Sequence, residues 1–166
     1  MFGIFVVNEM AKRDYQAEVG KESKKAKALI TNANVSLKYS TEVCNQIKGK
    51  LVEKMIAWLI RIERHEEFLP LKRYNKKVGH RKGDSKNGEK AGRYPEMTVR
   101  AFINLLELAK NNADFKGLDP EKLIILNAFA SKGFTRMSYQ SKGKISGKAR
   151  RVNATHIEVI VQEVKV

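Results

Sequence analysis

The chain has 166 residues, a formal net charge of +15 at pH 7, and 42% hydrophobic residues. This length and composition indicate one folded domain and exclude a chain that is disordered throughout. The single cysteine, Cys44, excludes an internal disulfide and is typical of a reducing compartment.

Residues 1–27 are predicted to form a flexible N-terminal extension. Met1–Val7 is apolar, but it is shorter than the roughly 20 residues that span a bilayer and lacks the features of a secretory signal. A docking strand, a frayed tail and a start codon misplaced upstream of Met10 remain open interpretations of this stretch. Val19–Lys27 is polar and charged, which is typical of a linker.

Alternation of polar and apolar residues over Asn34–Tyr39 predicts a short, half-buried strand. Ser40 or Thr41 can then cap a helix that carries Ile47 on its apolar side, and Gly49 is placed to end it. This part of the chain is therefore expected to start the folded body, a single domain over residues 28–166.

Two longer helices follow, over residues 51–66 and 95–113. The first repeats apolar residues at three- and four-residue spacing, and the second has Pro95 at its first position. Leu123–Ala130 and Thr155–Val164 are predicted strands, and the lack of helical periodicity between them favours one long β-hairpin over residues 123–164. With arms of about fifteen residues, the hairpin would reach on the order of 50 Å, beyond a body of this size.

The positive charge is concentrated in two segments. The first, called here the basic loop, is Pro70–Pro95, in which nine basic residues oppose two acids. It holds four glycines and few apolar residues, so it is predicted to be a loop that a partner orders. The second is Ser131–Val152, with seven basic residues and no acid, in the middle of the predicted hairpin.

Together the two segments carry +14 of the net +15. Concentrated like charge repels itself, so it indicates a polyanionic partner, and nucleic acid is the usual one. Readers of duplex DNA usually present a helix with a basic face. Here the helices are nearly neutral and the charge lies on a loop and a hairpin, which favours binding to folded RNA.

Residues for catalysis are scarce. His65, His80 and His156 are dispersed over the chain without acidic or cysteine neighbours at metal-ligand spacing, and no phosphate-binding glycine loop or nucleophile motif occurs. We therefore expect no enzymatic activity, no metal ion and no cofactor. An RNA-modifying enzyme would need a cofactor site that the sequence does not show.

Several stretches, in order and spacing, resemble the universal large-subunit ribosomal protein twenty-two family in its archaeal and eukaryotic form, where the eukaryotic protein is numbered seventeen. The resemblance runs from about Asn34 to Glu163. The matching stretches are ANVSLKYSTEVCNQIKGK (33–50), PLKRYNKKVG (70–79), GRYP (92–95), AKNNADFKGLD (109–119), YQSKGKI (139–145) and THIE (155–158).

The resemblance implies an α+β fold, with three helices packed on a small three-stranded antiparallel sheet and a long protruding β-hairpin. It also implies a structural protein of the large ribosomal subunit, cytoplasmic and not bound to a membrane. Such a protein would bind ribosomal RNA, aid subunit assembly and line the peptide exit tunnel with the hairpin. Its partners would be large-subunit ribosomal RNA, neighbouring ribosomal proteins and the nascent peptide. A non-ribosomal RNA-binding or RNA-chaperone module is the alternative.

The RNA contacts expected from the matching motifs and the basic segments fall into two groups. The group on the basic loop is Lys72, Arg73, Tyr74, Asn75, Lys76, Lys77, His80, Arg81, Arg93 and Tyr94. The group on the hairpin is Arg136, Tyr139, Lys142, Gly143, Lys144, Lys148, Arg150 and Arg151.

Overall fold

The computed structural model describes residues 15–17, 24–82, 88–140, 143–144 and 147–164. Its helices are α1 (Leu37–Ile47), α2 (Val52–Glu63), α3 (Glu96–Phe115) and a 3-10 turn, η2 (Pro120–Lys122). A three-stranded antiparallel sheet has the order β1-β5-β4, with β1 (Lys25–Ala33), β4 (Leu123–Tyr139) and β5 (Ala149–Glu163). Two short strands, β2 (Leu69–Pro70) and β3 (Gly92–Arg93), form a separate pair. The expected α+β fold is thus confirmed.

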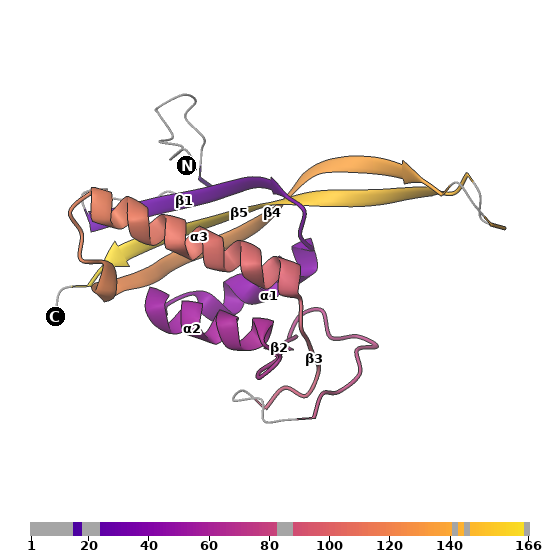
Figure 1. Cartoon of the computed structure of the whole chain (residues 1–166), viewed down its shortest axis with the longest axis horizontal. Coiled ribbons are helices and arrows are strands. Elements are labelled where there is room, and N and C mark those ends of the chain that lie inside the picture. The colour runs from indigo at the N-terminus through magenta and orange to yellow at the C-terminus, as the bar shows by residue number, and fades with distance from the viewer. Residues whose placement is uncertain (1–14, 18–23, 83–87, 141–142, 145–146, 165–166) are drawn as a thin grey trace.

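The helices lie on one face of the sheet (Figure 1). Helix α3 contacts β1 and β5, α1 contacts β4, and α2 packs on α3. The large, fully buried side chains at the centre include Ile47, Leu59, Phe102, Leu106 and Ile157, which come from all three helices and the sheet. Within the described ranges, no helix is long and apolar enough to cross a membrane.

The predicted helices over residues 51–66 and 95–113 are confirmed as α2 and α3, with ends shifted by up to three residues. The long hairpin is confirmed too, because β4 has 17 residues and β5 has 15. Beyond the pairing of Lys132 with Thr155, the two strands continue without β1 and project past the helices (Figure 1). The protruding hairpin is therefore part of the fold.

The strand predicted over residues 34–39 is wrong. Helix α1 begins at Leu37, with Ser36 in extended backbone before it, so neither Ser40 nor Thr41 is its cap. Thr41 lies inside the helix and donates its hydroxyl to the carbonyl of Leu37, at 2.8 Å. Val35 is buried, but it lies in a bend between β1 and α1 and not in a strand. Gly49 does follow the helix with a positive φ of 74°, as the sequence predicts.

The third strand of the sheet is instead β1, which includes part of the predicted linker. Ala26 and Ala28 face the helices and are almost fully buried, and their small size lets α3 lie close to the strand. Side chains from the end of α3 also bond to this edge strand. Asn112 donates to the carbonyl of Lys27 at 2.9 Å, and Lys116, the residue after the helix, donates to that of Lys25 at 3.0 Å. Residues 25–27 of the predicted extension therefore belong to the folded body.

The described part of the N-terminal region also contacts the sheet. The backbone N–H of Gln16 donates to the carboxylate of Glu158 on β5, and Lys27 lies over the ring of Tyr15 at 5.4 Å. Burial raises the pKa of Glu158 above that of an ordinary glutamate. Residues 1–14 and 18–23 of the predicted extension lie outside the described residues.

Candidate nucleic-acid interface

The basic loop is closed at its neck by backbone bonds and close packing. β2 pairs with β3, and the N–H of Leu71 donates to the carbonyl of Ala91 at 2.9 Å. Gly92 lies against the ring of Phe68, and a Cβ at this position would collide with a ring carbon. Only glycine fits so close an approach. The neck therefore fixes where the loop leaves the body.

A buried carboxylate on α1 then holds the start of the loop. Glu42 is 1% exposed, and its Oε1 accepts the backbone N–H groups of Arg73 and Tyr74, each at 2.8 Å. Its Oε2 accepts that of Lys72 at 3.3 Å. Hydrogen bonds to a charged acceptor are among the strong ones in proteins. With these backbone groups tied to Glu42, the side chains at 72 and 73 are left exposed to solvent.

These bonds correct the expectation that only a partner orders the basic loop. The sequence indicates few apolar residues there, but Leu71 is 1% exposed and Glu42 supplies the acceptors that the backbone needs. Glu42 also positions the start of the basic loop, and the sequence pattern does not predict this. A single acid among the apolar positions of α1 was the available signal, and its three partners lie about 30 residues away.

The structure brings the predicted residues of the basic loop together on one side of this neck. Seven are exposed: Lys72, Arg73, Asn75, Lys76, Lys77, His80 and Arg81. Tyr74, Arg93 and Tyr94 are half-buried. Between Asn75 and Val78 the chain makes a turn, closed by a 3.1 Å backbone bond, with Lys77 in the left-handed region. This turn presents Lys76 and Lys77 at its tip.

Both predicted aromatic contacts already have partners within the chain. Tyr74 lies beside Arg73 and Lys38, with ring distances of 5.6 and 5.7 Å. Arg81 lies over the ring of Tyr94 at 5.4 Å, and the His65 ring stacks on Tyr94 at a centroid distance of 4.6 Å. Each tyrosine ring thus has cations of the same chain beside it, and the sequence does not indicate these contacts.

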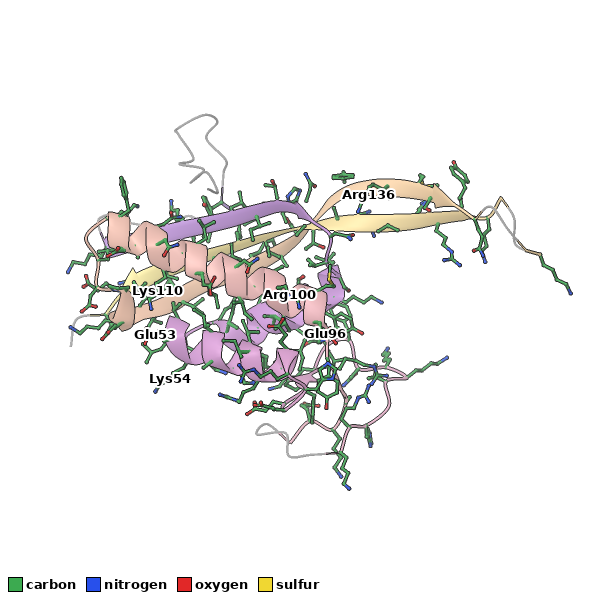
Figure 2. The ribbon with its side chains drawn as sticks, viewed as in Figure 1. Glu53, Lys54, Glu96, Arg100, Lys110 and Arg136 are labelled. Carbon is green, nitrogen blue, oxygen red and sulfur yellow. The ribbon has the colours of Figure 1, made fainter. Side chains whose placement is uncertain are left out.

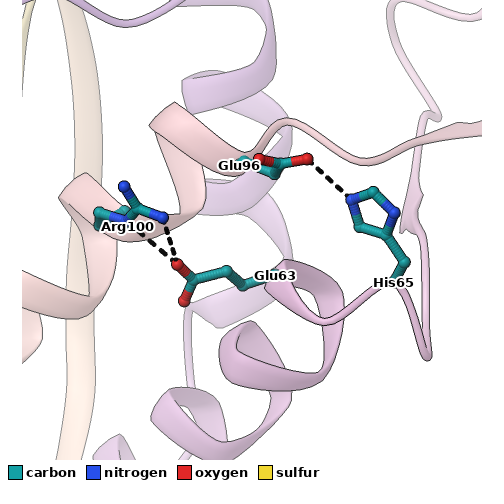
Figure 3. Close-up of polar contacts among 4 residues, drawn as sticks. All are labelled: Glu63, His65, Glu96 and Arg100. Carbon is teal, nitrogen blue, oxygen red and sulfur yellow. Dashed lines mark hydrogen bonds and ion pairs between the residues drawn. The ribbon is translucent and has the colours of Figure 1, made fainter.

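His65 also ties α2 to α3 below the basic loop. Its Nε2 lies 2.8 Å from a carboxylate oxygen of Glu96, and Arg100 donates twice to Glu63 nearby (Figure 3). These pairs are exposed, so each contributes little stability by itself. The His65–Glu96 pair lies where the basic loop joins α3, because Glu96 is the first residue of that helix.

Asparagines clamp the hairpin where it leaves the body. Asn32, with a positive φ of 54°, accepts the N–H of Phe134 on its Oδ1. Asn34 accepts from the guanidinium of Arg136 at 3.1 Å. Gly133 lies inside this clamp, where a Cβ would come within 2.6 Å of the Asn32 side-chain oxygen. The contacts lie beside the irregularity between Lys132 and Thr135, so they set the direction of the projecting strands.

Both faces of the projecting hairpin carry cations. Paired residues share a face, so Arg136, paired with Val152, and Arg150, paired with Ser138, lie on one face. The other face holds Arg151 and a shallow hollow lined by Lys132, Thr135, Met137, Arg151 and Asn153. Tyr139, Gly143, Lys144 and Lys148 are exposed toward the end of the hairpin, and Lys142 lies outside the described residues.

The basic segments are not neutralised from within the described part of the chain. Ion pairs between described residues lie on the helices, the turn after α2 and the η2 turn, and none includes a lysine or arginine of the basic loop or of the projecting hairpin. The pairs are Arg61 with Glu67, His65 with Glu96, Arg100 with Glu63, Lys110 with Glu53, and Lys122 with Asp119. Figure 2 shows Lys110 and Arg100 on α3, and Arg136 on the projecting part of the hairpin.

Cys44 and His156, which could in principle be reactive, are engaged within the fold. Cys44 is buried, and this burial raises the pKa of its thiol to about 12. His156 accepts a backbone N–H from Asn32 on its Nδ1. Across the described ranges, no cluster of histidine, cysteine and acidic residues suited to a metal ion is found.

Comparison with known proteins adds a family to this geometry. Residues 28–162 match the model of a family described as ribosomal protein L22p/L17e. Over 154 residues the chain is 36% identical to a protein of Methanocaldococcus jannaschii named large ribosomal subunit protein uL22. The match covers 93% of this chain and 97% of that protein. Proteins of the same name from Methanococcus vannielii and Methanococcus aeolicus are 36% and 34% identical, with 93% of this chain and 99% of each relative covered.

Proposed function

Since the chain belongs to the ribosomal protein L22p/L17e family, we propose that it binds large-subunit ribosomal RNA through the basic loop and the projecting hairpin. Membership makes it a structural protein of the large ribosomal subunit. The role proposed here has no catalytic step. It is to hold RNA segments together during and after subunit assembly.

One observation carries the proposal: exposed cations are held on a backbone that the body fixes in advance. Glu42 and the neck position the loop before any partner binds, which lowers the ordering cost on association. The cations can then displace counterions from phosphates, and the arginines can bind a phosphate with two N–H groups.

For the hairpin, we propose that it runs between RNA segments and that its tip borders the peptide exit tunnel. Two strands cannot bury a core of their own, so a bare hairpin of this length is marginal in water. RNA on its cationic faces would supply the missing contacts. The nascent peptide would then pass the tip, near Lys144.

The loop contacts can be tested by replacing Lys72, Arg73, Lys76 and Lys77 with alanine. Binding to large-subunit RNA fragments should weaken, and the slope of log affinity against log salt should fall by about 0.7–0.9 for each phosphate that the variant no longer neutralises. A control with equal charge loss uses exposed cations of the helical side: Lys48, Lys50, Lys54 and Arg64. An unchanged slope in the loop variant, or equal losses in both variants, would contradict direct phosphate contact. Equal affinity of the parent chain for any duplex would instead favour an RNA chaperone.

The hairpin can be tested separately by deleting residues 141–148. We expect the body to stay folded and to enter large subunits, because the core lies on the other side of the Asn32 clamp. Loss of the folded state would show that the tip is part of the core. A photoreactive group at Lys144 should cross-link to the nascent peptide in translating ribosomes, and its failure to do so would refute the tunnel position.

A further inference from the structure

Helix α3 carries an uncharged stripe on its solvent side. Five exposed positions form it, together with Ala101, which is half-buried and also packs against the core: Met97, Ala101, Asn104, Leu108, Asn111 and Phe115. Phe115 is 93% exposed and Met97 is 63% exposed, so the stripe includes large apolar side chains in contact with solvent. Nothing in the RNA-binding surfaces described above uses these residues.

The spacing of the stripe is that of a helix-packing seam. The positions are separated by four, three, four, three and four residues, which is the repeat of the a and d positions in a coiled coil. At about 100° per residue, they stay within a band of about 80° along some 27 Å of helix. The buried residues of α3, such as Phe102 and Ala109, lie on the other side of the helix. The stripe is thus a second packing face, directed away from the core.

The charges beside the stripe show what kind of partner fits. Glu107 and Asp114, about two helical turns apart, are both exposed along one edge. Arg100 lies on the same edge near the start of α3, but its guanidinium is paired with Glu63. In a chain of net charge +15, these acids would repel phosphate. The stripe itself offers RNA no cation. A protein with basic residues fits this edge, whereas a second copy of this chain would bring the same acids.

We propose that the stripe binds an amphipathic α-helix of another large-subunit protein. Its apolar side chains would pack beside Leu108 and Phe115, and its lysines or arginines would face Glu107 and Asp114. Asn104 and Asn111 lie within the seam, where their amides can bond to polar groups of the partner, as polar residues do in coiled coils. This inference rests on the proposed function, because that function supplies the assembly in which the partner is found.

The test uses large subunits from cells whose only copy of this protein carries a photoreactive amino acid at Leu108. The control carries it at Lys54, an exposed position on α2 (Figure 2). After irradiation, Leu108 should cross-link to one protein, and the linked peptide should be a helix with basic residues. The Lys54 control should not give that product. Cross-links from Leu108 only to RNA, only to a second copy, or to nothing would overturn the inference.

These results are distinguishable from failure of the proposed function. Absence of the labelled protein from large subunits would overturn the proposed function, and this inference with it. Presence without a protein cross-link would overturn the inference alone.

A charge-reversal variant gives a second readout. Glu107→Lys with Asp114→Lys should reduce the cross-link yield about fivefold, the effect of losing roughly 1 kcal/mol of ion pairing. RNA affinity and its salt slope should not fall. Because both residues are exposed, the variant should fold, which circular dichroism checks. An undiminished yield in a folded variant would contradict the acidic edge as part of the docking surface.

Discussion

The role of Glu42 makes a quantitative prediction about the basic loop. Glu42→Ala removes the acceptor of three backbone N–H groups, two of them bonded at 2.8 Å. Hydrogen bonds to a charged group contribute roughly 1.5–3 kcal/mol each. Some of these amides can turn to water once released, so we expect a loss of about 3 kcal/mol in the free energy of unfolding, the lower end for breaking a buried charged site.

Glu42→Gln distinguishes the contributions of the two carboxylate oxygens, because it replaces only one of them with an NH₂ group. The amide oxygen can keep the bonds from Arg73 and Tyr74, both made to Oε1, while the amide N–H₂ meets the N–H of Lys72. The expected loss is about 1–2 kcal/mol, for one weak bond and one opposed donor. RNA affinity should fall in the same order, alanine below glutamine, because the loop must then be ordered on binding. The salt slope should stay constant, because no phosphate contact is removed.

The assay is urea unfolding followed by the fluorescence of Trp58, the single tryptophan, which packs against the core from α2. Glu66→Ala, at an exposed glutamate after α2, is the control and should change stability by less than about 0.5 kcal/mol. An alanine variant within about 1 kcal/mol of the parent, or a glutamine variant as unstable as alanine, would refute the anchoring role of Glu42.

Three further predictions concern other parts of the fold. Gly133→Ala should destabilise the hairpin root by about 1–3 kcal/mol, because the new methyl group clashes with the Asn32 side chain. Amide hydrogen exchange at the root should then be faster, and an unchanged exchange rate would argue against the clamp. Cys44 should resist thiol reagents at pH 8 until urea unfolds the chain, because its pKa of about 12 leaves almost no thiolate; rapid labelling of the folded protein would show the site to be open. Glu158 binds its proton more tightly in the folded than in the unfolded state, so its contribution is fully present below the unfolded pKa and is lost as pH rises. Glu158→Gln should therefore raise the urea midpoint at pH 7 and leave it unchanged below about pH 4, and equal gains at both would refute the stated cause.

Much of the fold could be predicted because apolar residues recur at regular intervals along its main helices and strands. Helices α2 and α3 and the hairpin strands have apolar residues at regular spacing, so their type and approximate limits follow from pattern. Strand β1 could not be found this way. Its inward residues, Ala26 and Ala28, are weak strand formers, and it is the packing of α3 that makes them suitable.

Part of the candidate site could likewise be predicted from the sequence, and part of it could not. The basic segments could be located by charge alone, because charge is a local property of the sequence. Glu42 and the Asn32 clamp depend on contacts between distant residues, and no local pattern predicts which amide a carboxylate or an asparagine will meet. The assignment of Tyr74 and Tyr94 to stacking on bases stays a prediction, now with intramolecular cations beside both rings.

The clamp at the hairpin root has a mechanical consequence. The strands beyond Thr135 are held to the body at one end only, by the contacts of Asn32, Asn34 and Gly133. From Thr135 to Tyr139, the last residue of β4, the arm is about 13 Å long at 3.3 Å per residue, so a root rotation of about 10° would displace its end by about 2 Å. Such a displacement is large enough to break a hydrogen bond made at the end of the arm. The direction in which the hairpin projects from the body is therefore set by three residues at its root.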